Sequence, residues 1–167
     1  PEPTETPLGE LLRVDAIEIG LGLRLLPLAS REVEDNILRR IQIIRNKLAT
    51  ELGIVLPEIR IRDNLQLAGN QYQIRIQGNP MASGRLSVNR LLVIDEHPEI
   101  DSELPGNVPA DGGVSEHGAR WIATDQREKA LQLGLQPLTP VEVFAIHLQD
   151  TVREHADALL TRDATIP

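Results

Sequence analysis

The spacing of apolar residues changes along the first half of this sequence, and this change limits the folds that the chain can adopt. Over residues 14–28 apolar and other side chains alternate, which is typical of a half-buried strand, and Gly20 and Gly22 allow a bulge or a close backbone approach. From Ser30 the apolar residues recur at the period of an amphipathic helix, which ends at Gly53. Strand-like alternation then resumes. This order predicts a fold that mixes helices and strands.

The predicted helix has signals at both of its ends. Ser30 is expected to be its N-cap, and Glu32, Glu34 and Asp35 would lie in its first turns, where the helix dipole favours acids. Gly53 can adopt the left-handed conformation that ends a helix. The predicted apolar face consists of Ile37, Leu38, Ile41, Ile44, Leu48 and Leu52.

Several short apolar runs follow this helix. Apolar residues alternate with polar ones over 54–62 and again over 72–76, and shorter apolar runs cover 81–86 and 91–94. Turn-prone residues separate these runs, so a β-meander is the most economical arrangement. The side chains of Tyr72, Ile74 and Ile76 are expected to point inward.

The second half of the chain contains a long segment without hydrophobic periodicity. Residues 95–118 are rich in proline, glycine and acids, and we predict a long loop that is either functional or disordered. After it, Thr124 is expected to cap a helix that stops at Gly134, and Pro140 to start a helix over 141–160. The apolar face predicted for this last helix consists of Val141, Phe144, Ala145, Leu148, Val152, Leu159 and Leu160.

The composition excludes several classes of protein. The 167 residues, 41% hydrophobic and 25% charged, suit one folded domain or two small interlocked lobes. A net charge of -8 repels nucleic acids, and the lack of cysteine removes disulfides, thiol nucleophiles and thiolate metal sites. With one Trp, one Tyr and one Phe the core must be aliphatic. No apolar run is long enough to span a membrane, and because the chain begins with proline we expect a piece of a longer protein.

The histidines are the candidate metal ligands. His97 and His117 lie among carboxylates in the long loop, so a divalent metal could bind there if the loop folded back, but a solvated acidic loop is the simpler interpretation. His147 and His155 are about two helical turns apart without a zinc-helix motif around them, and for His147 packing between helices is favoured over metal binding. We predict no metal and no cofactor.

No motif for nucleotide binding or nucleophilic catalysis is present. The sequence has no P-loop motif, and Gly20-Leu21-Gly22 lacks the third glycine and the following helix of a dinucleotide fold. A G-x-S-x-G elbow is also absent. We predict that the chain is not an enzyme and has no catalytic residue. A hydrolase or metal enzyme that uses His97 and His117 stays as an alternative.

Six basic residues could form a modest positive patch on this acidic protein. Four of them lie opposite the apolar face of the first helix, and two lie in the strand that follows it. The patch is either a solvated face or a contact for an acidic neighbour, including a second copy of the chain. Its members are Arg39, Arg40, Arg45, Lys47, Arg60 and Arg62.

Three neighbouring motifs are typical of one protein family. They are the helix end Glu51-Leu52-Gly53, the strand and turn P-E-I-R-I-R-D-N-L at 57–65, and the strand Y-Q-I-R-I-Q-G at 72–78. Further likeness at 90–94, at Trp121-Ile122 and over 143–162 extends the match. The sequence resembles, over about residues 14–162, the cytoplasmic part of the FHIPEP family, the export-gate proteins of bacterial flagellar and virulence type III secretion.

The resemblance implies an α+β fold with a discontinuous first lobe. This lobe would comprise residues 14–87 and 137–156, in the order strand, helix, strand and meander, and would include a C-terminal helix. A smaller lobe, 88–136, would be inserted into it. Residues 1–13 would be a linker, and 157–167 would begin a following helical region.

The resemblance also implies a non-catalytic role in protein export. Family members carry this unit on the cytoplasmic face of the bacterial inner membrane, where it assembles into a ring. There it docks secretion chaperones, export substrates and proteins of the ATPase complex. For this chain the resemblance implies the same partners, no nucleic acid, and contact with the membrane only through upstream segments of a full-length protein.

Seven residues are candidate contacts with such partners. Asp63, Asn64 and Leu65 lie at a corner between a strand and a loop, where Asp63 and Asn64 could instead cap a turn. The other four lie around the groove that the resemblance implies, and Ile146 among them could instead belong to the core. These four are Ser115, His117, Ile146 and His147.

Two positions depart from the flagellar pattern of the family. Residues 111–118 contain no phenylalanine, and Ile146 stands where flagellar members have threonine. An aromatic anchor and a hydroxyl are thereby lost, and buried aromatics often dominate interface energies. The alternative function is therefore a divergent member that is repurposed as a structural or regulatory interaction module, without chaperone docking.

Overall fold

The computed structural model describes residues 17–32, 34–53, 56–94, 108–109 and 119–156. Within these ranges strands and helices are mixed, so the predicted α+β class is confirmed. The elements are, in chain order, β1 (Ile17–Leu21), the 3₁₀ helix η1 (Leu23–Ala29), α2 (Ile37–Leu52), β2 (Ile59–Asp63), β3 (Gln71–Ile76), β4 (Asn79–Arg85), β5 (Arg90–Ile94), β6 (Val108–Pro109), β7 (Ala119–Ala123), the 3₁₀ helix η3 (Thr124–Gln126), α3 (Arg127–Gln132) and α4 (Pro140–Glu154).

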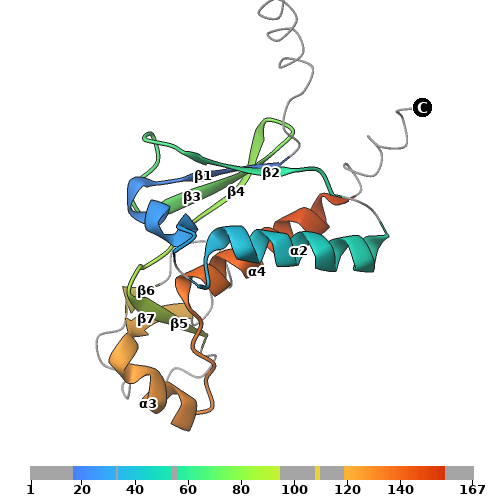
Figure 1. The fold of residues 1–167 in the computed structure, drawn as a ribbon. Coiled ribbons are helices and arrows are strands. Elements are labelled where there is room, and N and C mark those ends of the chain that lie inside the picture. The colour runs from blue at the N-terminus through green and yellow to red at the C-terminus, as the bar shows by residue number, and fades with distance from the viewer. Residues whose placement is uncertain (1–16, 33, 54–55, 95–107, 110–118, 157–167) are drawn as a thin grey trace, which may run out of the picture.

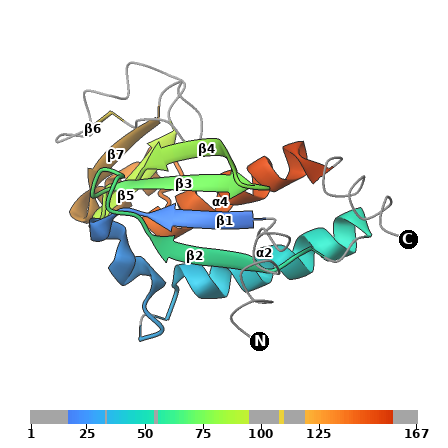
Figure 2. The same ribbon diagram turned by 90° about the horizontal axis from the view of Figure 1, so that it is seen from above.

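The first sheet has the strand order β2-β1-β3-β4, and α2 and α4 cover one of its faces (Figures 1 and 2). β1 pairs with β2 in parallel and with β3 antiparallel, and β3 pairs antiparallel with β4. A parallel pair needs a crossover connection, and α2 supplies it between β1 and β2. The second sheet has the order β5-β7-β6 and lies with α3 near the beginning of α4 (Figure 1).

The predicted meander describes only part of this topology. β3 and β4 form an antiparallel hairpin, but β2 is separated from β3 by β1, and β5 belongs to the second sheet. The predicted inward residues Tyr72, Ile74 and Ile76 are buried. Their alternation reported the burial of β3 correctly, but alternation alone carries no information about which strand lies beside which.

The predicted first strand is too long at its C-terminal end. After β1 the chain forms η1, in which Pro27 has no N–H to give to a sheet. Gly22 lies between the two elements, and a Cβ built on it would lie 2.0 Å from the carbonyl oxygen of Ala68. The sequence predicted that Gly20 and Gly22 would allow such a close backbone approach, and Gly22 does. Residues 14–16 lie outside the described residues.

The start of α2 also differs from the sequence prediction. Ser30 ends η1, and the N-cap is Asn36, whose Oδ1 accepts a hydrogen bond from the backbone N–H of Arg39 at 2.9 Å. The first turn of α2 contains no acid, because the helix begins after Asp35. Gly53 adopts the left-handed conformation with φ of 69°, so the predicted helix end is confirmed.

The elements of the second half fit the predictions in part. Val108–Pro109 forms the short strand β6, which pairs with β7, whereas the rest of the segment 95–118 lies outside the described residues. Thr124 begins η3 rather than capping α3, and Gly134 after α3 has φ of 82°. α4 has a complete capping box between Thr139 and Glu142. The predicted continuation of this helix through Leu159 and Leu160 lies outside the described residues.

A single apolar cluster joins the first sheet, both long helices and one face of the second sheet. Ile17, Ile19 and Ile74 of the first sheet have no exposed surface, and Leu92 and Trp121 of the second sheet belong to the same cluster. Backbone hydrogen bonds of 2.8 Å in both directions between Leu92 and Leu138 tie β5 to the segment before α4. A small second cluster, Leu91, Val93, Ile122 and Ala130, fills the space between β5, β7 and α3.

Candidate functional site

The packing of α2 against α4 leaves a groove between their outward surfaces. Ile44 and Ala145 are buried at its base, and Leu138 closes one end. The groove has a volume of about 260 Å³. Its rim carries two isoleucines that are unusually exposed for their type: Ile43 of α2 at 49% and Ile146 of α4 at 36%. This groove is the candidate site.

Charged side chains line the groove and hold its two helices together. Arg40 of α2 approaches Glu142 of α4 to 3.8 Å, and it also donates two hydrogen bonds to the Asp35 carboxylate, at 2.8 and 2.9 Å. The hydrogen bonds from Arg40 lower the pKa of Asp35, and those to Asp35 raise the pKa of Arg40. Lys47 adds a second positive charge to the lining. The groove therefore offers an apolar floor and a rim that is more basic than acidic.

Beyond this groove, a second ion pair links the same two helices. The Arg153 guanidinium of α4 donates to the carboxylate of Glu51 in α2 at 2.5 Å. This hydrogen bond lowers the pKa of Glu51. The two helices are thus connected by ion pairs at two places along their contact, in addition to their buried apolar packing.

The opposite side of α4 packs into the sheet through a small aromatic cluster. The ring of Phe144 lies edge-on to that of Tyr72, with centroids 5.2 Å apart, and the Tyr72 hydroxyl lies 2.5 Å from Nδ1 of His147. Gly84 of β4 makes room for this ring, because a Cβ on Gly84 would lie 2.6 Å from the Tyr72 hydroxyl oxygen. We call Tyr72, Gly84, Phe144 and His147 the inner seam.

Burial keeps the hydrogen-bonded pair of the inner seam uncharged. Burial lowers the pKa of His147, against the opposing influence of Asp150 and Glu154 on the same helix. Burial also raises the pKa of the Tyr72 hydroxyl. Both shifts favour a protonated Tyr72 hydroxyl that donates to the unprotonated Nδ1 of His147. His147 therefore has a packing role, as predicted, but it packs against β3 of the sheet and not between helices.

The seven predicted contact residues do not form one site. Ile146 lines the groove, so the alternative that places it in the core is wrong. His147, next in sequence, points to the other side of α4 and into the inner seam. Ser115 and His117 lie outside the described residues.

Asp63, Asn64 and Leu65 lie at the end of β2 and do not line the groove. The Asn64 side chain accepts a hydrogen bond from the backbone N–H of Gln66 at 2.9 Å, as expected of a turn-capping residue. Asp63 is the last residue of β2. Leu65 is 78% exposed, the highest value among the large apolar side chains that the structure describes. A contact role of this corner stays a prediction.

The basic residues singled out in the sequence do not form one patch. Arg40 and Lys47 line the groove, whereas Arg45 donates to the carbonyl oxygen of Leu56 at 3.2 Å. Arg60 and Arg62 lie on β2, on another part of the surface. A helical period separates polar from apolar faces, but it does not show which part of a polar face will lie beside a neighbouring helix.

The sequence analysis did not single out four residues that line the groove, namely Ile43, Leu138, Glu142 and Gln149. Ile43 falls outside the apolar face predicted for α2, although it is a large β-branched residue beside Ile44. The signal that could have identified Ile43 is an apolar residue outside the apolar face of an amphipathic helix. Such a side chain does not contribute to the core and stays at the surface, where a partner can contact it.

Within the described part of the chain, no three His, Asp or Glu side chains converge as metal ligands would, and His97 lies outside that part. Among the described helices, none combines the length and the apolar composition that a membrane-spanning helix requires.

Comparison with known proteins shows relatives along almost the whole chain. A profile of the FHIPEP family matches residues 2–166. The flagellar biosynthesis protein FlhA of Bacillus subtilis is 36% identical over 158 residues, which are 93% of this chain and 23% of that protein. FlhA of Helicobacter pylori is 32% identical over 162 residues, which are 95% of this chain and 21% of that protein. The chain therefore spans less than a quarter of these relatives.

Solved structures of similar fold agree with this match. The Chlamydia pneumoniae CdsV protein superimposes with a TM-score of 0.74 at 19% identity, over 86% of this chain and 43% of that one. A cytoplasmic domain of Salmonella InvA gives a TM-score of 0.65 at 15% identity, over 90% of this chain and 85% of that domain. These identities are too low to carry more than the fold. With the profile match over nearly every residue, the chain belongs to the FHIPEP family.

Proposed function

We propose that this chain is a non-catalytic portion of the cytoplasmic region of a type III protein-export gate, and that it docks partner proteins in the groove between α2 and α4. The observation that carries the proposal is the pair of exposed isoleucines, Ile43 and Ile146, above an apolar floor in a member of this family. Exposed apolar side chains that line a groove can serve as anchors of a protein interface. The surrounding charges, Arg40, Lys47 and Glu142, suit a polar rim.

The replacement of the flagellar threonine by Ile146 changes the chemistry of docking rather than removing the groove. An isoleucine offers no hydroxyl, but it adds apolar area that a partner can bury, at roughly 25 cal/mol per Å². We therefore propose an apolar anchor on the partner, held between Ile43 and Ile146. Secretion chaperones, export substrates and ATPase-complex proteins are the proposed partners.

Assembly into a ring is part of the same proposal. EPEC SctV-C has been solved as a nonamer, and the Chlamydia pneumoniae CdsV protein has been solved in complex with CdsO. By analogy we propose that the full-length protein forms a ring on the cytoplasmic face of the inner membrane. Electron microscopy of the detergent-extracted full-length protein tests this proposal, and a monomer at all concentrations would contradict it.

We also propose the lobe boundaries that the resemblance implies. Residues 14–87 and 137–156 would form the first lobe around β1 to β4, and 88–136 the inserted lobe around β5 to β7. Residues 1–13 would be a linker, and 157–167 would begin a helical region. Limited proteolysis followed by mass spectrometry would map these boundaries.

A second candidate function follows from the same substitution. If Ile146 marks a divergent groove, the chain would be a structural or regulatory interaction module without chaperone docking. This alternative predicts an interaction partner outside the secretion machinery. The fold and the groove are the same under both functions. The two functions therefore differ in the identity of the bound partner and not in the stability of the chain.

Affinity capture distinguishes the two functions. The tagged chain is incubated with lysate of its source organism at low and moderate salt, and bound proteins are identified by mass spectrometry. Recovery of secretion chaperones, export substrates or ATPase-complex proteins is the expected result. Reproducible absence of all three classes, with the chain shown to be folded by circular dichroism, would contradict the docking proposal and favour the repurposed module.

A further inference from the structure

The strand β2 forms an open edge of the first sheet. It pairs with β1 on one side, and no other strand in the described part of the chain pairs with its outer side (Figure 2). The backbone N–H of Asn64 donates to the carbonyl oxygen of Leu21 at 2.9 Å. The backbone N–H and C=O groups of successive residues in a strand point in alternating directions. The backbone groups of Arg60 and Arg62 therefore point toward β1, as those of Asn64 do. The backbone groups of Ile59, Ile61 and Asp63 point outward.

A groove runs along this open edge, between β2 and the beginning of α2. Its volume is about 410 Å³, and it is distinct from the groove between α2 and α4. Ile59 and Ile61 are half-buried on the side of β2 that faces the helices, and Leu38 of α2 forms the other wall. An apolar strip thus lies directly beside a row of backbone groups that point outward.

Arginine side chains alternate with these isoleucines along the strand, and Arg60, Arg62 and Glu58 also line the groove. Arg60 and Arg62 are more than a third exposed. Glu58 lies 3.9 Å from Arg60, and Glu18 lies 2.6 Å from Arg62, so two acids share the surface with them. The strand therefore presents apolar and basic side chains in strict alternation.

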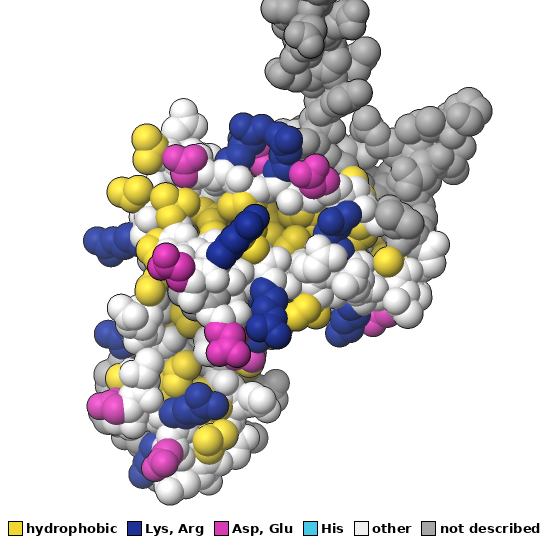
Figure 3. Space-filling model, viewed as in Figure 1, with side chains coloured by type: hydrophobic (Ala, Val, Ile, Leu, Met, Phe, Trp, Pro, Cys, Tyr) yellow, Lys and Arg dark blue, Asp and Glu magenta, His cyan; other side chains and the backbone are white. Residues whose placement is uncertain are grey.

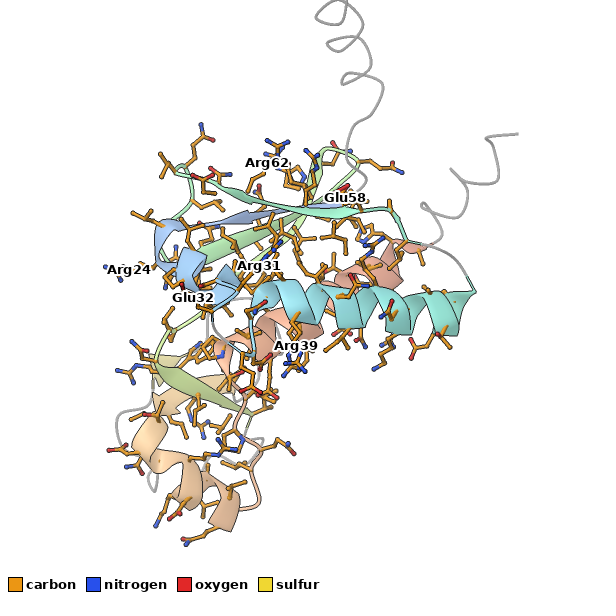
Figure 4. The ribbon with its side chains drawn as sticks, viewed as in Figure 1. Arg24, Arg31, Glu32, Arg39, Glu58 and Arg62 are labelled. Atoms are coloured by element: carbon orange, nitrogen blue, oxygen red, sulfur yellow. The ribbon has the colours of Figure 1, made fainter. Side chains whose placement is uncertain are left out.

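The surrounding face of the molecule is also rich in arginine. Figure 3 shows an apolar band across this face, with Lys and Arg side chains over and around it. Figure 4, in the same view, shows Arg62 at the sheet, Arg31 between the sheet and α2, and Arg39 on α2. The acids of the sequence are concentrated in 1–16 and 95–118, so the described residues hold more Lys and Arg than Asp and Glu although the chain carries a net charge of -8.

We propose that the open edge of β2 binds an extended segment of a partner protein in which apolar and acidic residues alternate. The segment adds a strand to the sheet, as in other domains that bind a peptide between a sheet edge and a helix. Its backbone pairs with the outward groups of Ile59, Ile61 and Asp63. Its apolar side chains enter the groove beside Leu38, and its acidic side chains lie on the face of Arg60 and Arg62.

This inference stands apart from the function proposed for the groove between α2 and α4. The two grooves lie on different sides of α2 and share no residue.

Charged residues on an edge strand can also serve to prevent unwanted pairing between sheets. The two roles make opposite predictions about an added peptide: a protected edge rejects it, and a docking edge accepts it.

The test uses a soluble synthetic peptide of four Glu-Val repeats with blocked ends. It is titrated into the isotope-labelled chain, and amide hydrogen exchange is followed by NMR. We expect slower exchange of the amides of Ile61 and Asp63 when the peptide is present, because their N–H groups point outward. The amides of Arg60 and Arg62, which already bond to β1, should change little. This alternating pattern is specific to strand addition.

Two controls make the result decisive. The variant Arg60→Glu should weaken binding of the Glu-Val peptide about tenfold, because it replaces an attraction with a repulsion at an exposed position. The matched variant Arg85→Glu changes the same charge on β4, at the other edge of the sheet, and should leave the affinity unchanged. Thermal unfolding shows whether each variant is folded.

Three outcomes would overturn the proposal. They are no change in the exchange of Ile61 and Asp63 at millimolar peptide, equal binding of a Lys-Val peptide of the same length, and equal loss of affinity in Arg60→Glu and Arg85→Glu. None of them bears on the groove between α2 and α4. A failure here therefore leaves the proposed function standing.

Discussion

Two neighbouring residues of α4 lie in very different surroundings. His147 points into the molecule, where its Nδ1 lies 2.5 Å from the Tyr72 hydroxyl and where Phe144 packs against the same ring. Ile146 points away from the sheet and leaves 36% of its surface exposed, beside Ile43 of α2. Both are large side chains one position apart on one helix, yet the fold buries the polar one more deeply.

The two residues differ in what they contribute: one to the stability of the fold, the other to contact with a partner. A polar residue that is hydrogen-bonded inside the inner seam contributes to the stability and uniqueness of the fold. An isoleucine left at the surface contributes little to stability and offers apolar area to a partner. The two sides of α4 should therefore respond to substitution in opposite ways, with stability lost on the inner side and binding lost on the outer side.

The largest effect on the inner side is expected for Phe144→Ala. Phe144 is fully buried against Tyr72, so its removal leaves a cavity and should lower the free energy of unfolding by about 3–5 kcal/mol. Urea unfolding followed by circular dichroism measures this change. Phe144→Leu, which retains most of the volume, should cost clearly less. A loss below about 1 kcal/mol in Phe144→Ala would show that the inner seam is not packed as described.

Gly84→Ala should have the next largest effect. The added Cβ would lie 2.6 Å from the hydroxyl oxygen of Tyr72 and 2.8 Å from its Cζ, and the buried ring has little room to move. Overpacking of this kind costs about 1–3 kcal/mol in the free energy of unfolding. Gly20→Ala is the matched control on β1, because its Cβ would meet neighbours at 3.5 Å, an ordinary contact distance. Equal stability of the two variants would contradict the tight contact.

The pH dependence of stability is a smaller, directional test of the inner seam. Because burial lowers the pKa of His147, the unfolded chain takes up this proton at a higher pH than the folded chain does. The stabilising contribution of neutral His147 is therefore present above about pH 6.5, the ordinary pKa of histidine, and is lost as the pH falls toward the folded-state pKa. The wild type should lose more stability between pH 7.5 and 5 than His147→Asn, in which the other acids still titrate. An identical pH profile for both chains would contradict the neutral Tyr72–His147 pair.

The smallest effect on stability is expected for Ile146→Gln. Glutamine is a good helix former, and Ile146 leaves 36% of its surface exposed, so the free energy of unfolding should change by no more than about 0.5 kcal/mol. Thermal and urea unfolding check this expectation. A loss as large as that of Gly84→Ala would mean that Ile146 supports the core, and the contrast between the two sides of α4 would fail.

Local sequence signals correctly predicted the helix boundaries that depend only on nearby residues. The 3.6-residue period and Gly53 located α2, and Pro140 located the start of α4. The N-cap was misplaced because Ser30 and Asn36 are both good caps, and the choice between them depends on η1, which the sequence did not reveal. Pro27 inside the apolar run 23–28 was the overlooked sign that the strand had ended.

The candidate site could be predicted only in part. The resemblance drew attention to Ile146, but its exposure depends on how α2 and α4 pack, which no local pattern determines. Ile43 was missed for the same reason. His147 was named both as a contact and as a packing residue, and the distinction depends on Tyr72, which lies 75 positions away in the sequence. The open edge of β2 follows from strand order, which alternation does not encode.

The central claim is that the groove between α2 and α4 docks proteins of the export machinery. Its most direct test is affinity capture from source lysate with three chains of matched stability: wild type, the double variant Ile43→Gln/Ile146→Gln, and Leu131→Gln, which changes an exposed apolar residue of α3 away from the groove. We predict that wild type and Leu131→Gln recover the same secretion proteins and that the double variant loses them. Equal recovery by all three chains, or no recovery of secretion proteins by the wild type, would contradict the claim.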